Sequence, residues 1–342
     1  MSTRHNQRLG ICVVGAGAMG AQHAEGWRAV EEARLIAVAD VDAERAQRFV
    51  EEYGFASWFT DYREAIALDE VDVVSVCTPA FYHPEVTLFA AQHGKHILCE
   101  KPIALTLKGA DQMIEAARSH GVKLSVGFQL RRSRRTEELR KRIQGGELGR
   151  PVMFRRNISA PIRTTVGKPA MHDMRRGNGG PVVDICCHFF DLLRVILNAE
   201  PARVTAHGFV FAEGRKELRG IEEVAPDTAA ILIEYNSGDL GVITITWGLP
   251  PGVQGGNMED ILGPEGAIVL TSNEIRVIKE GGETQRIISP QENEKAQEIR
   301  DFARAILEDI EPEVTGEDGR IALRVSLAAL ESMRSGGPVS LP

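Results

Sequence analysis

The chain of 342 residues has only five cysteines, no long apolar run and no excess of basic residues. Because no stretch of about 18 apolar residues occurs, we expect no transmembrane helix and no membrane partner. The net charge of −8 argues against nucleic acid as a partner, since binding to phosphates depends on Lys and Arg. The cysteines form no CxxC pair and the polar N-terminus shows no signal-peptide pattern. We therefore expect buried thiols in a reducing, cytoplasmic setting.

The remaining composition is that of a globular protein. Apolar residues make up 43% and charged residues 26%, which excludes a disordered or collagen-like chain. At roughly 150 residues per domain, the length predicts about two domains. Glycine, with 34 residues, exceeds its usual share of about 7%. This surplus indicates many turns, or backbone that approaches a ligand closely.

In the first part of the chain, short apolar runs alternate with helical patterns. This alternation predicts a doubly wound parallel sheet that is covered by helices on both faces. We expect strands at 9–14, 34–39, 71–77, 96–99 and 123–127, and helices at 18–31, 43–53, 84–93 and 106–119.

The pattern changes after about residue 128, where strand-like runs follow one another with short turns. This predicts a second α/β domain with a large, mostly antiparallel open sheet. The expected domains are 1–128 and 129–342. In the second we expect helices at 133–145, 291–309 and 318–334, a strand after Pro151, an irregular stretch at 160–180, an apolar segment at 182–197, and strands at 202–211, 228–236, 239–247, 266–271 and 274–280.

A glycine-rich turn lies between the first expected strand and the first expected helix. Gly15, Gly17 and Gly20, with Ala18 and Met19 between them, fit the pattern GxGxxG. In this context the first glycine makes the tight turn, the second lets backbone approach a pyrophosphate, and the third lets helix and strand pack closely. The helix N-terminus then offers N–H groups to the phosphates. The sequence therefore predicts a dinucleotide site here.

An acidic residue selects among dinucleotides. Asp40 ends the second expected strand, about 20 residues beyond Gly20, where a carboxylate binds the ribose hydroxyls. A carboxylate there repels a 2′-phosphate, so NAD is favoured over NADP. The neighbouring Asp42 and Arg45 leave NADP open as the alternative.

A candidate catalytic lysine follows the strand at 96–99. In a doubly wound sheet, ligands bind beyond the carboxyl ends of the strands, which places Lys101 of Glu100-Lys101-Pro102 at the crevice. Pro102 restricts the backbone of Lys101 and is compatible with a cis bond. The plainer alternative is a surface salt bridge after a strand.

The apolar segment at 182–197 carries a second polar group. Asp184 and His188 are spaced i, i+4 and so share one helix face, which Asp191 joins. A histidine beside a carboxylate can accept a proton near neutral pH. The alternative is a satisfied core histidine or a polar stripe that faces water.

Two further clusters of residues resemble functional sites but have simpler explanations. Cys186 and Cys187 adjoin His188, and Cys99 could join them, but the usual zinc-ligand spacings are absent and we expect no metal site. The basic run at 131–142 is typical of a solvated helix face.

Together these motifs resemble the glucose–fructose oxidoreductase / inositol dehydrogenase / rhizopine-catabolism (Gfo/Idh/MocA) family. The match covers nearly the whole chain and is highly specific for the family, though less so for the substrate. It is carried by Gly15–Gly20, Asp40, Thr78-Pro79 with His83, Gly94-Lys95-His96, Cys99-Glu100-Lys101-Pro102, Gly127-Phe128 with Arg131, Gly146, Gly149 and Pro151, and Gly179–Asp184 with His188 and Asp191.

The resemblance implies a Rossmann domain and a C-terminal domain that binds substrate and forms homodimers or homotetramers through its open sheet. It implies Lys101, Asp184 and His188 as a catalytic triad. Thr78, His83 and Glu100 match positions near the cofactor ribose and nicotinamide, and we add Arg131 and Asn157 as candidate substrate contacts. One departure is Cys186, where the family commonly has glycine.

The function that these expectations support is NAD-dependent hydride transfer from or to a secondary alcohol of a cyclic polyol or sugar, of inositol, aldose or anhydrosugar type. His188 would accept the hydroxyl proton and Lys101 would hold the reacting oxygen, or Lys101 would itself be the acceptor. One alternative is glycoside cleavage or epimerisation assisted by tightly bound NAD. Another is a non-catalytic regulator that senses NAD(H).

Overall fold

The apolar runs of the first part of the chain form a parallel sheet in the computed structural model, which describes residues 8–162, 169–289 and 292–342. The strand order β3-β2-β1-β4-β5-β6 and the parallel pairing of all neighbours confirm the doubly wound sheet. Every residue of the central strand β1 is buried, as its unbroken apolar sequence predicts. The strands are β1 (Leu9–Val14), β2 (Ala33–Ala39), β3 (Ser57–Phe59), β4 (Val73–Val76), β5 (His96–Cys99) and β6 (Leu124–Val126).

The described residues divide into two units. The first unit contains the chain up to Gln129 together with Asn293–Arg320, and the second contains Leu130–Glu292 together with Ile321–Pro342. The first unit therefore includes a segment from the far end of the sequence.

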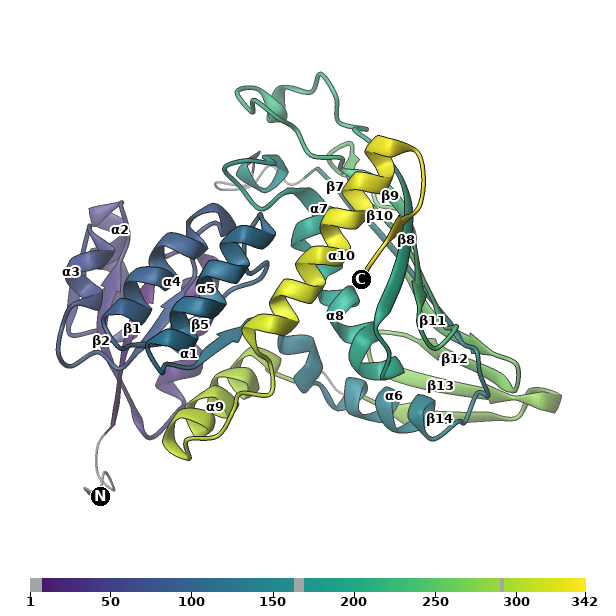
Figure 1. Ribbon diagram of the computed structural model, residues 1–342, viewed down its shortest axis with the longest axis horizontal. Helices are drawn as coiled ribbons and strands as arrows, with labels where there is room; N and C mark the ends of the chain where they lie inside the picture. The colour runs from purple at the N-terminus through teal and green to yellow at the C-terminus, as the bar shows by residue number, and fades with distance from the viewer. Residues whose placement is uncertain (1–7, 163–168, 290–291) are drawn as a thin grey trace. The chain divides into compact units, whose positions relative to one another are not determined.

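Six α-helices lie wholly among the described residues of the first unit. In Figure 1, α4 and α5 lie side by side, and α9 lies beside α1. The helices are α1 (Ala18–Arg28), α2 (Ala43–Tyr53), α3 (Tyr62–Ile66), α4 (His83–Gln92), α5 (Leu107–Ser119) and α9 (Glu294–Leu307). Helix α2 begins at a typical cap, where the Asp42 side chain accepts from the Arg45 N–H, and ends at Gly54 in the left-handed region.

Helix α9 supplies part of the hydrophobic core of the first unit. Ile299 and Phe302 are buried in one cluster with Ile11 and Trp27. The helices approach closely at Gly26, because a Cβ there would lie 2.4 Å from Cδ1 of Ile299. The periodicity of 291–309 predicts a helix with a buried face, but it does not identify the surface against which that face packs.

The second unit is built on a nine-stranded sheet in the order β14-β13-β12-β11-β7-β10-β9-β8-β15. All pairs are antiparallel except β7 with β10, which confirms a large, mostly antiparallel sheet. The strands are β7 (Met153–Pro161), β8 (Pro201–Phe209), β9 (Thr228–Tyr235), β10 (Leu240–Leu249), β11 (Met258–Gly263), β12 (Gly266–Leu270), β13 (Glu274–Lys279), β14 (Thr284–Ile288) and β15 (Val339–Ser340).

Helices cover one face of this sheet (Figure 1). They are α6 (Arg134–Gln144), α7 (Gly180–Asp184), α8 (Cys186–Leu197) and the part of α10 (Gly316–Ser335) that follows Arg320. Leu193 of α8 packs at Gly241, and Met333 of α10 packs at Gly208. Along β9 and most of β10, buried residues alternate with less buried ones, so the opposite face is open.

The segment at 182–197 is not one continuous helix, so the prediction that Asp184 and His188 share a single helix face is wrong. Helix α7 ends at Asp184, and Ile185 (φ −104°, ψ −44°) separates it from α8. The His188 N–H bonds to the Ile185 carbonyl at 3.1 Å, three residues back rather than four. The i, i+4 spacing in the sequence does not reveal this local tightening.

The sequence pattern also missed β11, β14, β15, β3 and α3. Strand β11 contains Glu259 and Asp260, whose charges hide its strand character. Both side chains are nearly buried because they pair with Arg156 and Arg155 of the neighbouring β7. The other missed elements have five residues or fewer.

All five cysteines are free thiols, and all except the half-buried Cys77 are buried. Among the helices of the described ranges, none combines the length and apolar character needed to cross a bilayer.

The core contribution of α9 can be tested with Phe302→Ala. Phe302 is fully buried, so its truncation should lower the free energy of unfolding by about 3–5 kcal/mol. Urea unfolding followed by circular dichroism measures this change. Phe81 is 48% exposed, and Phe81→Ala should stay within about 0.5 kcal/mol. Equal, small effects of both variants would contradict the placement of α9 in the core.

Candidate functional site

The three glycines of the GxGxxG motif differ in the space around them. Gly15 has φ +105°, and a Cβ there would lie 2.7 Å from the Cys77 carbonyl oxygen. A Cβ on Gly20 would lie 2.0 Å from the carbonyl oxygen of Gly15. At Gly17, by contrast, an added Cβ would meet no atom within 4 Å. Gly15 and Gly20 therefore permit the turn itself, while Gly17 borders open space.

The start of α1 is suited to an anion. Its N-cap is Gly17, and no side chain caps the helix. The first N–H groups of a helix have no partner within the helix, so at an uncapped terminus they can bind a phosphate. The open space at Gly17 and the uncapped start of α1 thus lie at the same point of the backbone.

Asp40 is anchored beside this loop. Its carboxylate accepts the Ala16 N–H at 2.8 Å and the Asp42 N–H at 3.0 Å. Nη1 of Arg45 lies 3.3 Å from either oxygen, but the Arg45 side chain is 47% exposed. A carboxylate has about four lone-pair sites, and the two main-chain N–H groups use two of them. A ribose hydroxyl would bind in place of the exposed Arg45 side chain.

His83 connects the ends of two neighbouring strands. Its Nε2 lies 2.8 Å from the Thr78 carbonyl oxygen, and its Nδ1 lies 2.9 Å from the Pro102 carbonyl oxygen. Burial lowers the pKa of His83, although the two carbonyls favour its charged form. The Oγ1 atom of Thr78 is buried and has no hydrogen-bond partner among the described residues.

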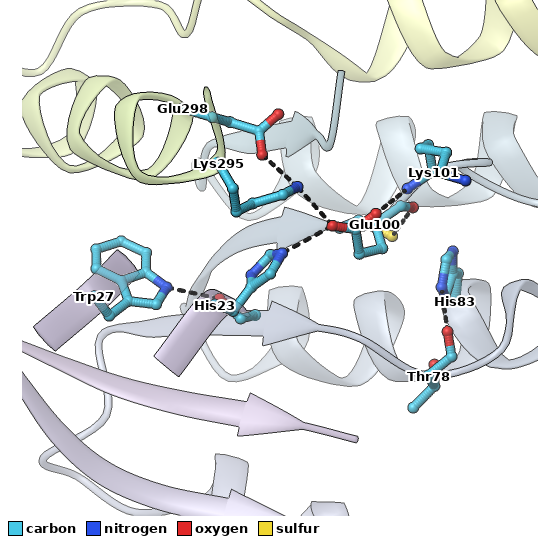
Figure 2. A network of polar contacts seen from close by, with 10 residues as sticks. His23, Trp27, Thr78, His83, Glu100, Lys101, Lys295 and Glu298 are labelled. Carbon is cyan, nitrogen blue, oxygen red and sulfur yellow. Dashed lines mark hydrogen bonds and ion pairs between the residues drawn. The ribbon is translucent and has the colours of Figure 1, made fainter. Parts of the chain in front are cut away.

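The Glu100 carboxylate lies at the centre of a buried polar network (Figure 2). Its Oε1 accepts from Nε2 of His23 at 2.9 Å and from Nζ of Lys295 at 2.6 Å. Its Oε2 accepts the main-chain N–H of Lys101 at 3.2 Å. Lys295 also donates to Glu298 at 2.7 Å.

The charges of this network are fixed by their partners. Burial disfavours ionisation of Glu100, but the Lys295 ammonium and the His23 ring hold the pKa of this carboxyl well below its usual range. Burial lowers the pKa of His23, so its ring is neutral at pH 7 and Nε2 carries the proton that it donates. Glu100 therefore remains an anion. The next residue, Lys101, is joined to Pro102 by a cis peptide bond.

In the second unit, Asp184 and His188 are both largely buried, at 1% and 8% exposed. Asn178 donates from Nδ2 to Oδ1 of Asp184 at 3.0 Å. The Cys187 thiol bonds to the Asp184 carbonyl at 3.3 Å, which ties the end of α7 to the start of α8. Asp184 is therefore held at its side chain by Asn178 and at its main chain by Cys187, despite the break in the helix at Ile185.

Two other predicted residues of the second unit have strong partners of their own. Arg131 makes a buried, bidentate ion pair with Asp191, with N···O distances of 2.7 and 2.5 Å. Asn157 on β7 donates to the Gly256 carbonyl at 2.6 Å and accepts from Thr244 at 2.8 Å. Their roles as substrate contacts stay predictions.

The predicted site residues divide between the two units. The nucleotide residues and Lys101 belong to the first unit, and Asp184, His188, Arg131 and Asn157 belong to the second. The triad of Lys101, Asp184 and His188 combines residues of both units and remains a prediction. Within the described part of the chain, no group of three His, Cys, Asp or Glu residues could hold a metal ion.

Sequence reasoning missed His23, Lys295, Glu298 and Asn178. The only local signal was for Asn178, which lies in the glycine-rich turn before α7. A lysine and a glutamate three residues apart on a helix are typical of a solvated face, and nothing local marks them as buried.

Family models and known relatives agree with this architecture. One model, described as an oxidoreductase family with an NAD-binding Rossmann fold, matches residues 9–128. A second, described as the C-terminal alpha/beta domain of an oxidoreductase family, matches residues 140–341.

Several relatives match over nearly their whole length. The chain is 30% identical to myo-inositol 2-dehydrogenase of Thermotoga maritima over 97% of this chain and 98% of the relative. It is 29% identical to scyllo-inositol 2-dehydrogenase (NAD(+)) of Bacillus subtilis over 96% and 95%. The crystal structure of aldose-aldose oxidoreductase from Caulobacter crescentus, complexed with glycerol, has a TM-score of 0.83 and 26% identity over 98% of this chain and all of that one.

The open space at Gly17 gives a sharp test of the nucleotide site. Gly17→Ala should leave the melting temperature within about 2 °C, because the methyl group meets no atom. It should raise the dissociation constant for NADH about tenfold or more, since the methyl occupies the approach of the pyrophosphate. NADH fluorescence measures the binding.

Gly20→Ala is the matched control, because its methyl collides with the Gly15 carbonyl and should lower the melting temperature itself. Unchanged NADH affinity in Gly17→Ala would place the nucleotide elsewhere.

Proposed function

Because the chain belongs to the Gfo/Idh/MocA family of oxidoreductases, we propose that it transfers a hydride between a secondary alcohol of a cyclic polyol or sugar and NAD. The observation that supports this best is the position of Lys101. It follows β5 in the same parallel sheet whose β1 leads into the glycine loop. Ligands of such sheets bind beyond the carboxyl ends of the strands, so a lysine there can meet a substrate beside the nucleotide.

The residues of the first unit fit a dinucleotide. The uncapped start of α1 would hold the pyrophosphate, and Asp40 would accept from the ribose hydroxyls. The buried Thr78 hydroxyl is a further polar group at the end of β4. When bound, the nicotinamide supplies the hydride chemistry, and the protein supplies position and electrostatics.

We assign proton transfer and charge stabilisation to the triad. His188 removes the hydroxyl proton, and Asp184, held by Asn178, orients His188 or a neighbouring substrate hydroxyl. Lys101 holds the reacting oxygen and stabilises the negative charge that develops on it. In the alternative assignment, Lys101 rather than His188 accepts the proton.

The names of the relatives support the substrate class. Two are named as inositol dehydrogenases and one as an aldose-aldose oxidoreductase. Inositols and cyclic aldoses are rich in secondary alcohols. We further propose that 1–128 serve as the nucleotide domain and 129–342 as the substrate domain. The open face of the second sheet, where β9 alternates buried and less buried residues, is the proposed surface for a homodimer or homotetramer.

Turnover tests the proposal against its alternatives. Absorbance of NADH should rise when the chain and NAD meet one or more members of a panel of inositols, aldoses and anhydrosugars. Net NADH production argues against redox-assisted glycoside cleavage or epimerisation, which returns the hydride to the product. NADH binding without turnover on any compound would favour a sensor of NAD(H) and contradict the enzyme.

The triad is tested on the best substrate of that panel. His188→Ala and Lys101→Ala should each lower kcat about 10²-fold or more. The exposed residues His120 and Lys108 provide matched controls, and their alanine variants should keep the wild-type rate. Near-normal rates for both triad variants would refute the assignment.

Cofactor preference is tested at Asp40. Asp40→Ser should raise the dissociation constant for NADH about tenfold or more, because a charge-assisted hydrogen bond is lost. Binding of NADPH should weaken less or improve, since the repulsion of the 2′-phosphate is removed.

Asp61→Ser is the control, because Asp61 also caps a helix and pairs with an arginine, and serine still caps α3. Equal effects of Asp40→Ser on NADH and NADPH would contradict a role of Asp40 in discrimination.

A further inference from the structure

The buried network around Glu100 joins three distant parts of the first unit. His23 belongs to α1, Glu100 follows β5, and Lys295 belongs to the first turn of α9 (Figure 2). All three side chains are at most 5% exposed. Buried ions are costly unless they are paired, so the positions of these three side chains depend on one another.

The donors at Glu100 divide between its two oxygens. Oε1 accepts from both His23 and Lys295, which uses its two lone-pair directions. Oε2 faces the other way and accepts the main-chain N–H of Lys101. The carboxylate thus transmits the positions of α1 and α9 to the peptide that carries Lys101.

The surroundings leave the carboxylate little freedom. A Cβ on Gly127 would lie only 3.1 to 3.2 Å from the Glu100 carboxylate atoms, so the group packs directly against the backbone of the next strand's end. On the other side of Lys101, the Pro102 carbonyl lies 2.9 Å from Nδ1 of His83. The backbone is therefore held both before and after Lys101.

The network also keeps its charge. Burial would lower the pKa of Lys295, but Glu100 and Glu298 together raise it above its ordinary value. Glu100 and Lys295 therefore remain an ion pair across the neutral range, and the hold on Lys101 does not depend on a titration near pH 7.

We propose that Lys295, with His23, is a positioning residue for Lys101: it clamps the Glu100 carboxylate, which in turn fixes the main chain at the reacting lysine. The proposal rests on the proposed function, in which Lys101 binds the reacting oxygen. Helix α9 thereby serves the active site as well as the core. Small displacements of a catalytic group are expensive, with about 10²-fold in rate for a shift of about 1 Å.

The test compares Lys295→Gln with two matched controls. Glu298→Gln keeps the pair between Lys295 and Glu100, and Lys123→Gln removes another lysine–carboxylate pair of the first unit, with Asp309. We expect Lys295→Gln to lower kcat about tenfold or more, with KM for the alcohol and the NADH dissociation constant changed less than about threefold. Both controls should stay within about twofold of wild type.

Folding is checked by the melting temperature. If Lys295→Gln alone does not fold, the double variant Lys295→Gln/Glu298→Gln is used in its place, because it removes one positive and one negative charge together. The single variant is compared with wild type and the double variant with Glu298→Gln. A folded variant whose kcat stays within about twofold of its reference overturns the proposal.

A mutant cycle with Glu100→Gln asks whether Lys295 acts through Glu100. If it does, adding Lys295→Gln to Glu100→Gln should lower kcat by less than about a further threefold, because a neutral amide has already replaced the carboxylate through which Lys295 acts. Losses that multiply independently would overturn the proposal.

A second readout needs no substrate. Acetic anhydride labels lysine amines of the folded, full-length chain, and peptide mass spectrometry gives the rate at Lys101 relative to the exposed Lys108. Lys295→Gln should change this ratio about threefold or more, because the amine moves, and Lys123→Gln should not. An unchanged ratio overturns the positioning role. Absence of turnover in wild type overturns the proposed function instead, and the labelling then decides the positioning role alone.

Discussion

The ionised Glu100 carboxylate is the constraint around which the first unit is organised. An anion with so little access to water must be paired, and the chain supplies His23 from α1 and Lys295 from α9. Helix α1 is also the helix that begins at the glycine loop, and Glu100 directly precedes Lys101. One buried carboxylate thus links the helix that begins at the glycine loop to the peptide of the candidate catalytic lysine.

The sequence predicted the parts of this site whose cause is local. Gly15 and Gly20 are required by contacts within their own turn, and Asp40 by its place at the end of β2. His23 and Lys295 were not predictable in the same way. A helical period shows that a face is buried but not what it packs against, and a lone lysine near a helix start is usually solvated.

The second unit shows the same division. Strand β9 and most of β10 alternate regularly in burial, so their pattern was visible in the sequence. Strand β11 was hidden because its buried acids are neutralised by arginines of β7, a neighbour distant in sequence. The break at Ile185 was hidden because spacing alone cannot register one irregular residue. For β11 the missing information was tertiary, and for the break it was a local backbone irregularity.

We propose that a polyol or sugar reacts at Lys101 and His188 beside NAD. The most direct measurement is a crystal structure of the chain with NADH and a cyclic polyol that it turns over. We expect one secondary hydroxyl oxygen to lie within hydrogen-bond distance, about 2.6–3.2 Å, of Lys101 Nζ and of a ring nitrogen of His188. The carbon that bears it should face the nicotinamide. A polyol bound with neither residue at its reacting hydroxyl would contradict the account.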